Sequence, residues 1–290
     1  MLELRNTYLR LGVLPGTGGG IARFDWLEDG GPLLRPCDDP DTTEPNRLGC
    51  YPLLPWSNRI AKGGFTHEGH DVVLAPNRSD EPYPIHGTGW QRPWTVAHHD
   101  ATDIVLTLHD ATAGAYAFRA TQHYRLDGPS LEIRLRVTNT GDFVLPFGLG
   151  VHPFFPRDAD TRLQAGASAL WMNDGEDPLP IALMRVPPEW DFTKPRPLPR
   201  GGINHAFTGW PGQAAVHWPS RSLRLHVDAQ ADVYVLYVPE GEDFFCLEPV
   251  DHPINAVHLP GGAVVNGMTA LAPGQQLERL FRFRVEAGVA

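Results

Sequence analysis

Leu131-Glu132-Ile133-Arg134-Leu135-Arg136-Val137 alternates apolar and charged residues without interruption. Because successive side chains of a β-strand point to opposite faces, this period of two predicts a strand with one buried face. The same alternation returns in Leu223-Arg224-Leu225-His226-Val227. Turn-forming residues in Leu126-Asp127-Gly128-Pro129 and Asn139-Thr140-Gly141-Asp142 flank the first strand, as in antiparallel all-β proteins. The pattern predicts an all-β fold, a large antiparallel sandwich or barrel.

Helices are expected to be few and short. The chain contains 30 Gly and 29 Pro, both of which interrupt helices. No stretch of about ten residues combines a polar N-cap, an apolar stripe at helical spacing and a glycine stop. We therefore expect a helix content below the average for globular proteins.

The length of 290 residues, 42% of them hydrophobic, is compatible with one large β-domain. The most proline-rich stretch, residues 178–199, holds seven prolines but also Trp190 and Phe192. Buried aromatic residues are not typical of flexible linkers, so we interpret this stretch as a long ordered loop. Residues 1–290 are predicted to form a single domain.

The charge and cysteine content exclude several classes of partner. A net charge of -10 and a pI near 5.7 disfavour nucleic acids, whose binding requires clustered Lys and Arg. No apolar run is long enough to span a membrane, and residues 1–6 lack the basic and apolar segments of a signal peptide. Three cysteines without a CxxC pair fit a reducing compartment. We expect a cytoplasmic protein that has no membrane partner.

Cofactor and metal motifs are missing from the sequence. The cluster Gly16-Thr17-Gly18-Gly19-Gly20 has Ile21 where a dinucleotide-binding loop requires its last glycine, so it predicts a β-turn. Thirteen histidines suggest a metal site, but no two stand at i and i+2, as one strand would need to direct both at an ion. No HExxH, GxSxG or Walker motif occurs. The sequence predicts neither a cofactor nor a catalytic metal.

Glu248 is the most informative single residue. It lies in the apolar segment Phe244-Phe245-Cys246-Leu247-Glu248-Pro249, where a carboxylate is costly unless it is paired or functional. His152, in Val151-His152-Pro153-Phe154-Phe155, is expected to be partly desolvated, which lowers its pKa unless a carboxylate lies nearby. Burial would raise the pKa of Glu248. A buried ion pair and a core histidine bound to backbone are the structural alternatives to a proton-transferring pair, the interpretation that we favour.

The order of these motifs resembles a known family. Arg59 in Pro55-Trp56-Ser57-Asn58-Arg59-Ile60, then His86 in Pro84-Ile85-His86-Gly87-Thr88-Gly89-Trp90, His152 and Glu248 are similar to the aldose 1-epimerases, or mutarotases, across nearly the whole chain. The resemblance implies a galactose mutarotase-like β-sandwich that interconverts the α and β anomers of a free sugar without a cofactor. It implies that Glu248 is the general base, His152 the general acid and His86 a group that holds or polarises the ring oxygen. Arg59 would bind sugar hydroxyls.

One position departs from the family pattern. Galactose mutarotases have an aspartate that grips sugar hydroxyls where this chain has Asn204, in Gly202-Ile203-Asn204-His205. A neutral amide forms a weaker bond with a hydroxyl than a carboxylate does, so the preferred sugar is left open. Trp90 is a candidate for packing against the apolar face of the sugar, although a large aromatic residue is more often part of the core. The sequence does not indicate an oligomeric state.

Two other functions remain open at the level of sequence. A carbohydrate-binding protein without turnover could use the same sandwich and would not need Glu248. A hexose-6-phosphate 1-epimerase would need a cationic pocket, for which Lys62, Arg78 and Arg92 are the candidates. In an acidic chain such residues are more often ordinary surface ion pairs, and the motifs around His86 and His152 resemble the free-sugar branch more closely.

Overall fold

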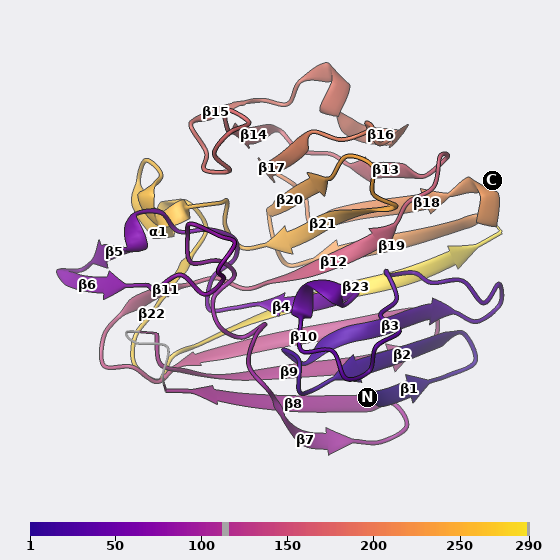
Figure 1. Cartoon of the computed structure of the whole chain (residues 1–290), viewed down its shortest axis with the longest axis horizontal. Helices are drawn as coiled ribbons and strands as arrows, with labels where there is room; N and C mark the ends of the chain where they lie inside the picture. Colours follow the sequence, from indigo (N-terminus) through magenta and orange to yellow (C-terminus); the bar gives the residue numbers. More distant parts are fainter. Residues whose placement is uncertain (112–115, 289–290) are drawn as a thin grey trace.

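Antiparallel strands build almost the entire protein. The computed structural model describes residues 1–111 and 116–288, and Figure 1 shows that long strands dominate it. Neighbouring strands in the two large sheets all run antiparallel. Within the described residues, the only α-helix is α1 (Gly262–Val265). The predicted all-β class with little helix is confirmed.

The ten-stranded sheet contains, in spatial order, β1 (Leu2–Arg5), β2 (Leu9–Leu14), β3 (Gly20–Trp26), β4 (Cys50–Leu53), β12 (Gly150–Pro156), β21 (Phe244–Val250), β20 (Val233–Val238), β17 (Ile203–Thr208), β14 (Ala169–Met172) and β15 (Ala182–Arg185). The nine-stranded sheet contains β16 (Phe192–Pro197), β13 (Arg162–Ala165), β18 (Gln213–Trp218), β19 (Leu223–Ala229), β23 (Gln276–Ala287), β10 (Ser130–Asn139), β9 (Phe118–Asp127), β8 (Asp103–Asp110) and β7 (Thr95–His99).

Two small strand pairs and short 3-10 turns complete the described elements. The pairs are β5 (Gly64–His67) with β6 (His70–Val73) and β11 (Leu145–Phe147) with β22 (Thr269–Leu271). The turns are η1 (Pro45–Arg47), η2 (Ala61–Gly63), η3 (Pro188–Trp190), η4 (Pro219–Arg221) and η5 (Ala256–His258).

The alternating stretch at 131–137 forms most of β10, near the middle of the nine-stranded sheet. Leu131, Ile133, Leu135 and Val137 are buried in the main core, as the period of two predicts. The intervening charged residues face outward, where Glu132 pairs with an arginine of β23. Apolar burial on one side and solvated charge on the other thus fix the orientation of the strand.

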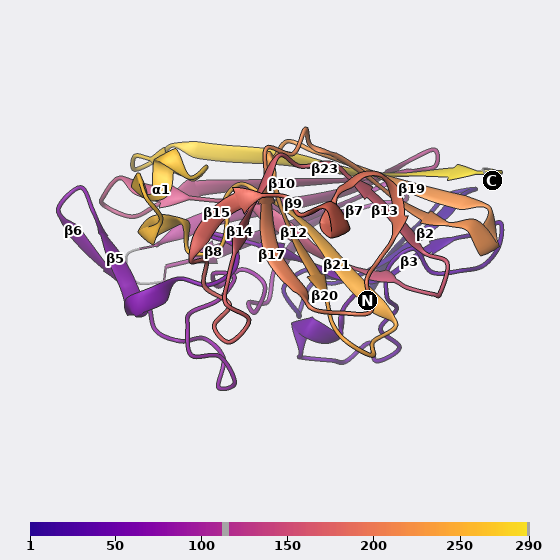
Figure 2. The same cartoon turned by 90° about the horizontal axis from the view of Figure 1, so that it is seen from above.

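The two large sheets lie face to face, and Figure 2 shows them as two layers. Phe155 of β12 and Phe283 of β23 meet between the layers, with ring centroids 6.4 Å apart. Both side chains belong to the main core cluster. The inner face of the ten-stranded sheet is therefore committed to packing, and only its outer face is available for a site.

Residues 178–199 are more ordered than the predicted loop. They include β15, which pairs with β14, and β16, which pairs with β13. Both are edge strands of the large sheets. An edge strand needs hydrogen bonds on one side only, so the prolines of β16 do not interrupt pairing in the way they would in a central strand. The high proline content of residues 178–199 therefore does not prevent strands from forming there.

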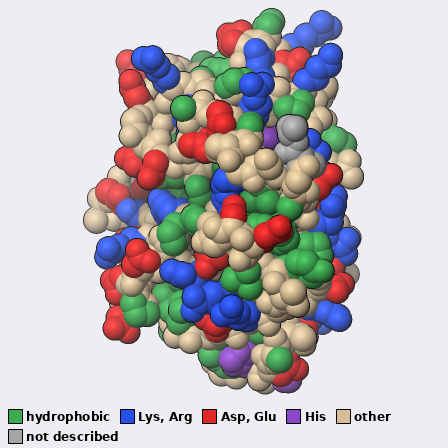
Figure 3. Space-filling view, turned by 90° about the vertical axis from the view of Figure 1, so that its right-hand side faces the viewer, with side chains coloured by type: hydrophobic (Ala, Val, Ile, Leu, Met, Phe, Trp, Pro, Cys, Tyr) green, Lys and Arg blue, Asp and Glu red, His purple; other side chains and the backbone are tan. Residues whose placement is uncertain are grey.

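The surface carries charges of both signs. On the face drawn in Figure 3, acidic and basic side chains are interspersed, and no continuous basic surface appears on that face. Among residues 1–111 and 116–288, no helix combines the length and the apolar character needed to cross a membrane.

Candidate active site

The alternation of side chains along β12 and β21 places a polar pair on the outer face of the ten-stranded sheet. Leu247 and Phe155 point into the core between the sheets. Their neighbours Glu248 and Phe154 therefore point the other way, as does His152, two residues before Phe154. Loops cover this face, so that Glu248 is 2% and His152 7% exposed. Strand periodicity alone thus brings a carboxylate and an imidazole to the same surface.

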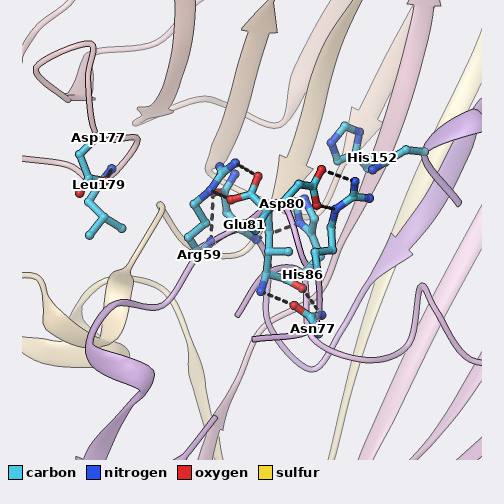
Figure 4. Close-up of polar contacts among 12 residues, drawn as sticks. Arg59, Asn77, Asp80, Glu81, His86, His152, Asp177 and Leu179 are labelled. Carbon is cyan, nitrogen blue, oxygen red and sulfur yellow. Dashed lines mark hydrogen bonds and ion pairs between the residues drawn. The ribbon is translucent and has the colours of Figure 1, made fainter. Parts of the chain in front are cut away.

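These side chains line a cavity of about 340 Å³. All six residues predicted from the sequence lie in its wall, namely Arg59, His86, Trp90, His152, Asn204 and Glu248. They come from strands and loops that are far apart in sequence, and Figure 4 shows Arg59, His86 and His152 on separate segments around one region. The structure therefore brings the whole predicted set together.

Glu248 and His152 form the polar centre of the cavity. Glu248 Oε1 lies 3.3 Å from His152 Nε2. Burial raises the pKa of Glu248 to about 8, against the opposing charge of Arg59. Burial also lowers the pKa of His152 to about 3. At neutral pH the pair therefore holds one proton, and burial of both groups favours its position on Glu248.

This proton position differs from what the sequence suggested. We expected a nearby carboxylate to keep His152 protonated, and the carboxylate is indeed nearby. Both groups are buried, however, so the ion pair would require two desolvated charges. The neutral arrangement avoids that penalty. The 3.3 Å contact still allows the proton to move between the two residues when a ligand changes the balance of charge.

Two atoms of the pair have no partner. Glu248 Oε2 and His152 Nδ1 are buried, and neither forms a hydrogen bond with a described residue. Leaving a buried polar atom unsatisfied costs about 1–3 kcal/mol, a cost that a hydrogen bond to a polar ligand would remove. Both atoms of the pair are therefore available to a polar ligand in the cavity.

His86 is held in one tautomer by the backbone of the neighbouring loop. Its Nδ1 accepts a hydrogen bond of 3.1 Å from the backbone N–H of Asn58. The backbone N–H of His86 donates in return to the Asn58 carbonyl at 3.0 Å. Burial, together with nearby His152, lowers the pKa of His86 well below its usual value. The ring is therefore neutral with its proton on Nε2, where it can only donate.

The loop that carries His86 adopts an uncommon backbone conformation. His86 has a φ of 61°, in the left-handed region, and Gly87 follows with a φ of 66°. A Cβ on Gly87 would lie 2.2 Å from the Leu54 carbonyl oxygen, so only glycine fits there. Asn77 spans the loop, donating to the Ile85 and Gly87 carbonyls at 2.7 and 2.8 Å. Its side-chain oxygen also accepts a hydrogen bond from the Ile85 N–H at 2.8 Å. Figure 4 shows Asn77 close to His86.

Asn77→Ala is expected to lower the free energy of unfolding by about 1–2 kcal/mol, because three backbone groups lose their partner. It should also release His86 from its single tautomer, which ¹⁵N NMR of the imidazole reports directly. Asn6→Ala is the matched control, because Asn6 likewise bonds the Leu9 N–H and the Gly128 carbonyl, away from the cavity. Equal ¹⁵N spectra for His86 in both variants would contradict this role for Asn77.

Arg59 combines a structural and a lining role. Its Nε and Nη2 bond the two carboxylate oxygens of Glu81, with Nε–Oε2 at 2.8 Å. Its Nη1 donates to Asn58 Oδ1 at 3.2 Å. Arg59 is thus paired with an acid and also forms part of the cavity wall. Figure 4 shows the fork between Arg59 and Glu81.

Trp90 and Asn204 differ in how they meet the cavity. Trp90 is 0% exposed, and its indole N–H donates to the Gly87 carbonyl at 3.1 Å. Its ring stacks on Tyr51 at 5.1 Å, so it mainly supports the wall from behind. Asn204, on β17, has its backbone carbonyl bound by Asn173, while its side chain has no partner among the described residues. Its amide is therefore free to meet a ligand.

Other lining residues were not predicted. Tyr51 packs against His152 with ring centroids 4.7 Å apart, and its hydroxyl donates to Asn46 at 2.8 Å. The unpredicted set also includes Arg35, Asn58, Asp80, Glu81, Tyr237 and Phe244. Asn58 and Phe244 belong to the segments quoted around Arg59 and Glu248, but no pattern in the sequence assigned any of this set to the cavity. The fold brings these residues together from strands and loops that are distant in sequence.

The three cations considered for a phosphate, Lys62, Arg78 and Arg92, do not come together at the cavity. Lys62 and Arg92 are not among the residues that line the cavity, whereas Arg78 is. Arg78 is held by Asp80 at 2.7 Å and by Glu44 at 3.3 Å. Within the described ranges, no group of three or more His, Cys, Asp or Glu side chains is arranged to hold a metal ion.

Comparisons with known proteins identify the family. A family model described as aldose 1-epimerase matches residues 1–284. The "Uncharacterized protein YphB" of Escherichia coli K12 is 34% identical over 277 residues, covering 92% of this chain and 93% of that protein. The "Uncharacterized protein YihR" of the same organism is 27% identical over 220 residues, or 70% of each chain.

Solved structures give the same result. A crystal structure of a candidate aldose 1-epimerase from Escherichia coli K12 superposes with a TM-score of 0.92 at 34% identity, covering 99% of this chain and 98% of that one. Galactose 1-epimerase from Lactobacillus acidophilus NCFM superposes with a TM-score of 0.81 at 21% identity, covering 99% and 94%, and this second likeness concerns the fold alone.

Proposed function

The chain belongs to the aldose 1-epimerase family, and from this premise we propose that it interconverts the α and β anomers of an aldose whose anomeric hydroxyl is free. The observation that carries the proposal is the contact of 3.3 Å between Glu248 and His152, buried in one cavity with unsatisfied polar atoms on both. Opening a sugar ring requires one group to take a proton and another to give one. The pair supplies both.

In the proposed reaction, Glu248 removes the proton of the anomeric hydroxyl while His152 protonates the ring oxygen. The C1–O5 bond breaks, giving the open-chain aldehyde, and Glu248 is left protonated with His152 neutral. Rotation about C1–C2 turns the aldehyde, and ring closure on its other face returns both protons in reverse. The open-chain stage therefore has the same protonation state that burial of the two side chains favours. This match stabilises the intermediate.

The other lining residues position the sugar in this proposal. The fixed Nε2–H of His86 donates toward the ring oxygen. Arg59 and Asn204 bind hydroxyls, and Trp90 supports the wall formed by Tyr51. Because Asn204 is neutral, it holds a hydroxyl less tightly than a carboxylate would.

The pH dependence of kcat/KM follows from the single proton of the pair. With pKa values of about 3 for His152 and about 8 for Glu248, the pair holds one proton between these limits. Above pH about 8 both groups are deprotonated, and no proton remains for the ring oxygen. We therefore expect kcat/KM to be flat at neutral pH and to fall about tenfold per pH unit above 8. Exchange NMR measures this after subtraction of the uncatalysed rate, and a rate that rises through pH 9 would contradict the assignment.

The test of the function follows the approach to anomeric equilibrium for a panel of freshly dissolved aldoses, including α-glucose and α-galactose. Polarimetry or proton NMR records the rate with and without the protein. We expect acceleration for at least one aldose, proportional to protein concentration and abolished by heat denaturation. No acceleration for any aldose, with binding retained, would leave a carbohydrate-binding protein as the better description.

A further inference from the structure

Arg35 is a cavity residue that the proposed reaction does not use. Its guanidinium lies 3.9 Å above the ring of Phe154 and 4.6 Å from that of Phe244. Its Nη2 donates to the backbone carbonyls of Asn46 and Leu48, the latter at 3.1 Å. These contacts fix the cation in the cavity wall and leave Nε and Nη1 without a protein partner in the described chain.

The charge of Arg35 is not balanced in the way that the other cavity arginines are. Arg59 is bound by Glu81, and Arg78 by Asp80. Arg35 has no carboxylate within ion-pair distance among residues 1–111 and 116–288, and burial lowers its pKa. A half-buried cation held by rings and carbonyls, but without a counterion, is a favourable place for an anion.

The position of Arg35 relates it to one part of a sugar. Phe154 stacks on His152 with ring centroids 4.6 Å apart, and Arg35 lies against the same Phe154 ring. Arg35 and the proposed acid therefore both contact the ring of Phe154. In a pyranose, the atom that receives the proton is O5, and its neighbour C5 bears the exocyclic C6. A charged group at C6 is therefore attached to the ring atom next to O5.

We propose that the substrate of this cavity carries an anionic group at C6, a carboxylate or a phosphate ester, and that Arg35 binds it. The proposal rests on the proposed epimerase function and specifies its substrate class. A carboxylated aldose is a uronic acid, and a phosphorylated one is a hexose 6-phosphate. Both bring the negative charge that the cavity lacks opposite Arg35.

The first experiment compares kcat/KM of the native protein for glucuronate, galacturonate, glucose 6-phosphate, glucose and galactose by exchange NMR. We expect at least one anionic sugar to exceed its neutral parent by tenfold or more, as a charge-assisted hydrogen bond provides. Preference for a uronate or for the phosphate ester identifies the anion. Raising the salt concentration should lower kcat/KM for the anionic sugar more than for the neutral one.

The second experiment uses Arg35→Met and Arg35→Lys. Met keeps an unbranched apolar side chain without the guanidinium charge, and we expect it to reduce kcat/KM for the anionic sugar at least tenfold more than for the neutral parent. Lys should restore part of the difference. Arg157→Met is the matched control, because Arg157 also binds two backbone carbonyls, those of Leu198 and Pro199, but lies outside this cavity.

The outcomes separate the two proposals. Turnover of neutral aldoses without preference for an anion, or equal losses for both sugars in Arg35→Met, overturns the anion site and leaves the epimerase function standing. Turnover of no aldose overturns the epimerase function. In that case, saturation-transfer NMR of glucuronate binding to the native and Arg35→Met proteins still tests the anion site, and equal binding to both would sink it.

Discussion

Replacing Glu248 by Gln is expected to lower kcat for anomer interconversion by about 10²- to 10⁴-fold, the range that general acid–base catalysis contributes. Gln keeps the shape of the side chain and its place on β21, but it cannot accept the proton of the anomeric hydroxyl. Sugar binding should persist, because the other lining residues are unchanged. Polarimetry gives the rate, and titration calorimetry or NMR gives the affinity.

The same substitution has a second signature in stability. Burial raises the pKa of Glu248 to about 8, so the folded state binds the proton more tightly than the unfolded chain does. The contribution of Glu248 to the free energy of unfolding therefore declines as pH rises from its ordinary pKa to about 8. Between pH about 6.5 and 8, where His152 is neutral in both the folded and the unfolded chain, Glu248→Gln lacks this decline, and its stability should depend less on pH than that of the native protein.

Glu242→Gln is the matched control for Glu248→Gln. Glu242 is exposed and close in sequence, and it does not line the cavity. Its replacement should leave rate and pH dependence as in the native protein. Retention of native turnover by Glu248→Gln would exclude the carboxylate as the base, whereas loss of binding together with turnover would point to a structural role.

Replacing His152 by Gln is the second change with a large expected effect, again about 10²- to 10⁴-fold in kcat. The amide can still contact Glu248 but cannot deliver a proton to the ring oxygen. Because the two residues exchange one proton, they act as a unit, so the double variant with Glu248→Gln should be little slower than either single variant. Rates from exchange NMR on all three proteins test this.

His217→Gln provides the control for His152→Gln. His217, on β18 of the other sheet, also has a pKa lowered by burial, to about 4, and a buried ring nitrogen without a partner. Its replacement tests the effect of altering a desolvated histidine away from the cavity.

The double variant of His152→Gln and Glu248→Gln has an outcome that would contradict a shared proton. If its loss in kcat equalled the product of the two single losses, His152 and Glu248 would act in independent steps.

The parts of the structure that the sequence predicted are those governed by local physics. Alternation at 131–137 predicted β10 because one face of a strand must be buried. Glu248 stood out because a carboxylate within an apolar segment carries an energetic cost that only pairing or function explains. Neither argument requires knowing which distant residues are in contact.

The parts that could not be predicted depend on contacts between distant segments. Tyr51 reaches the cavity because β4 pairs with β12, and Arg35 because its backbone N–H donates to the Phe154 carbonyl of β12 at 2.8 Å, although about a hundred residues or more separate these segments in the chain. The position of the proton on Glu248 depends on how completely both partners are buried, and the sequence indicated their burial but not its extent. The left-handed backbone of His86 is maintained by Asn77 and by close packing on Leu54. Long-range packing thus determines the details of the site.

The cavity has two kinds of wall, and this difference bears on how such a protein can diverge. The proton-transferring pair stands on β12 and β21, in the interior of the ten-stranded sheet, where each strand is bonded on both sides. Arg35, Arg59 and His86 stand on connecting segments outside these strands. Substitutions in the connecting segments can change which sugar binds without moving the proton-transferring pair. The substrate of such a protein can therefore change during evolution while its reaction stays the same.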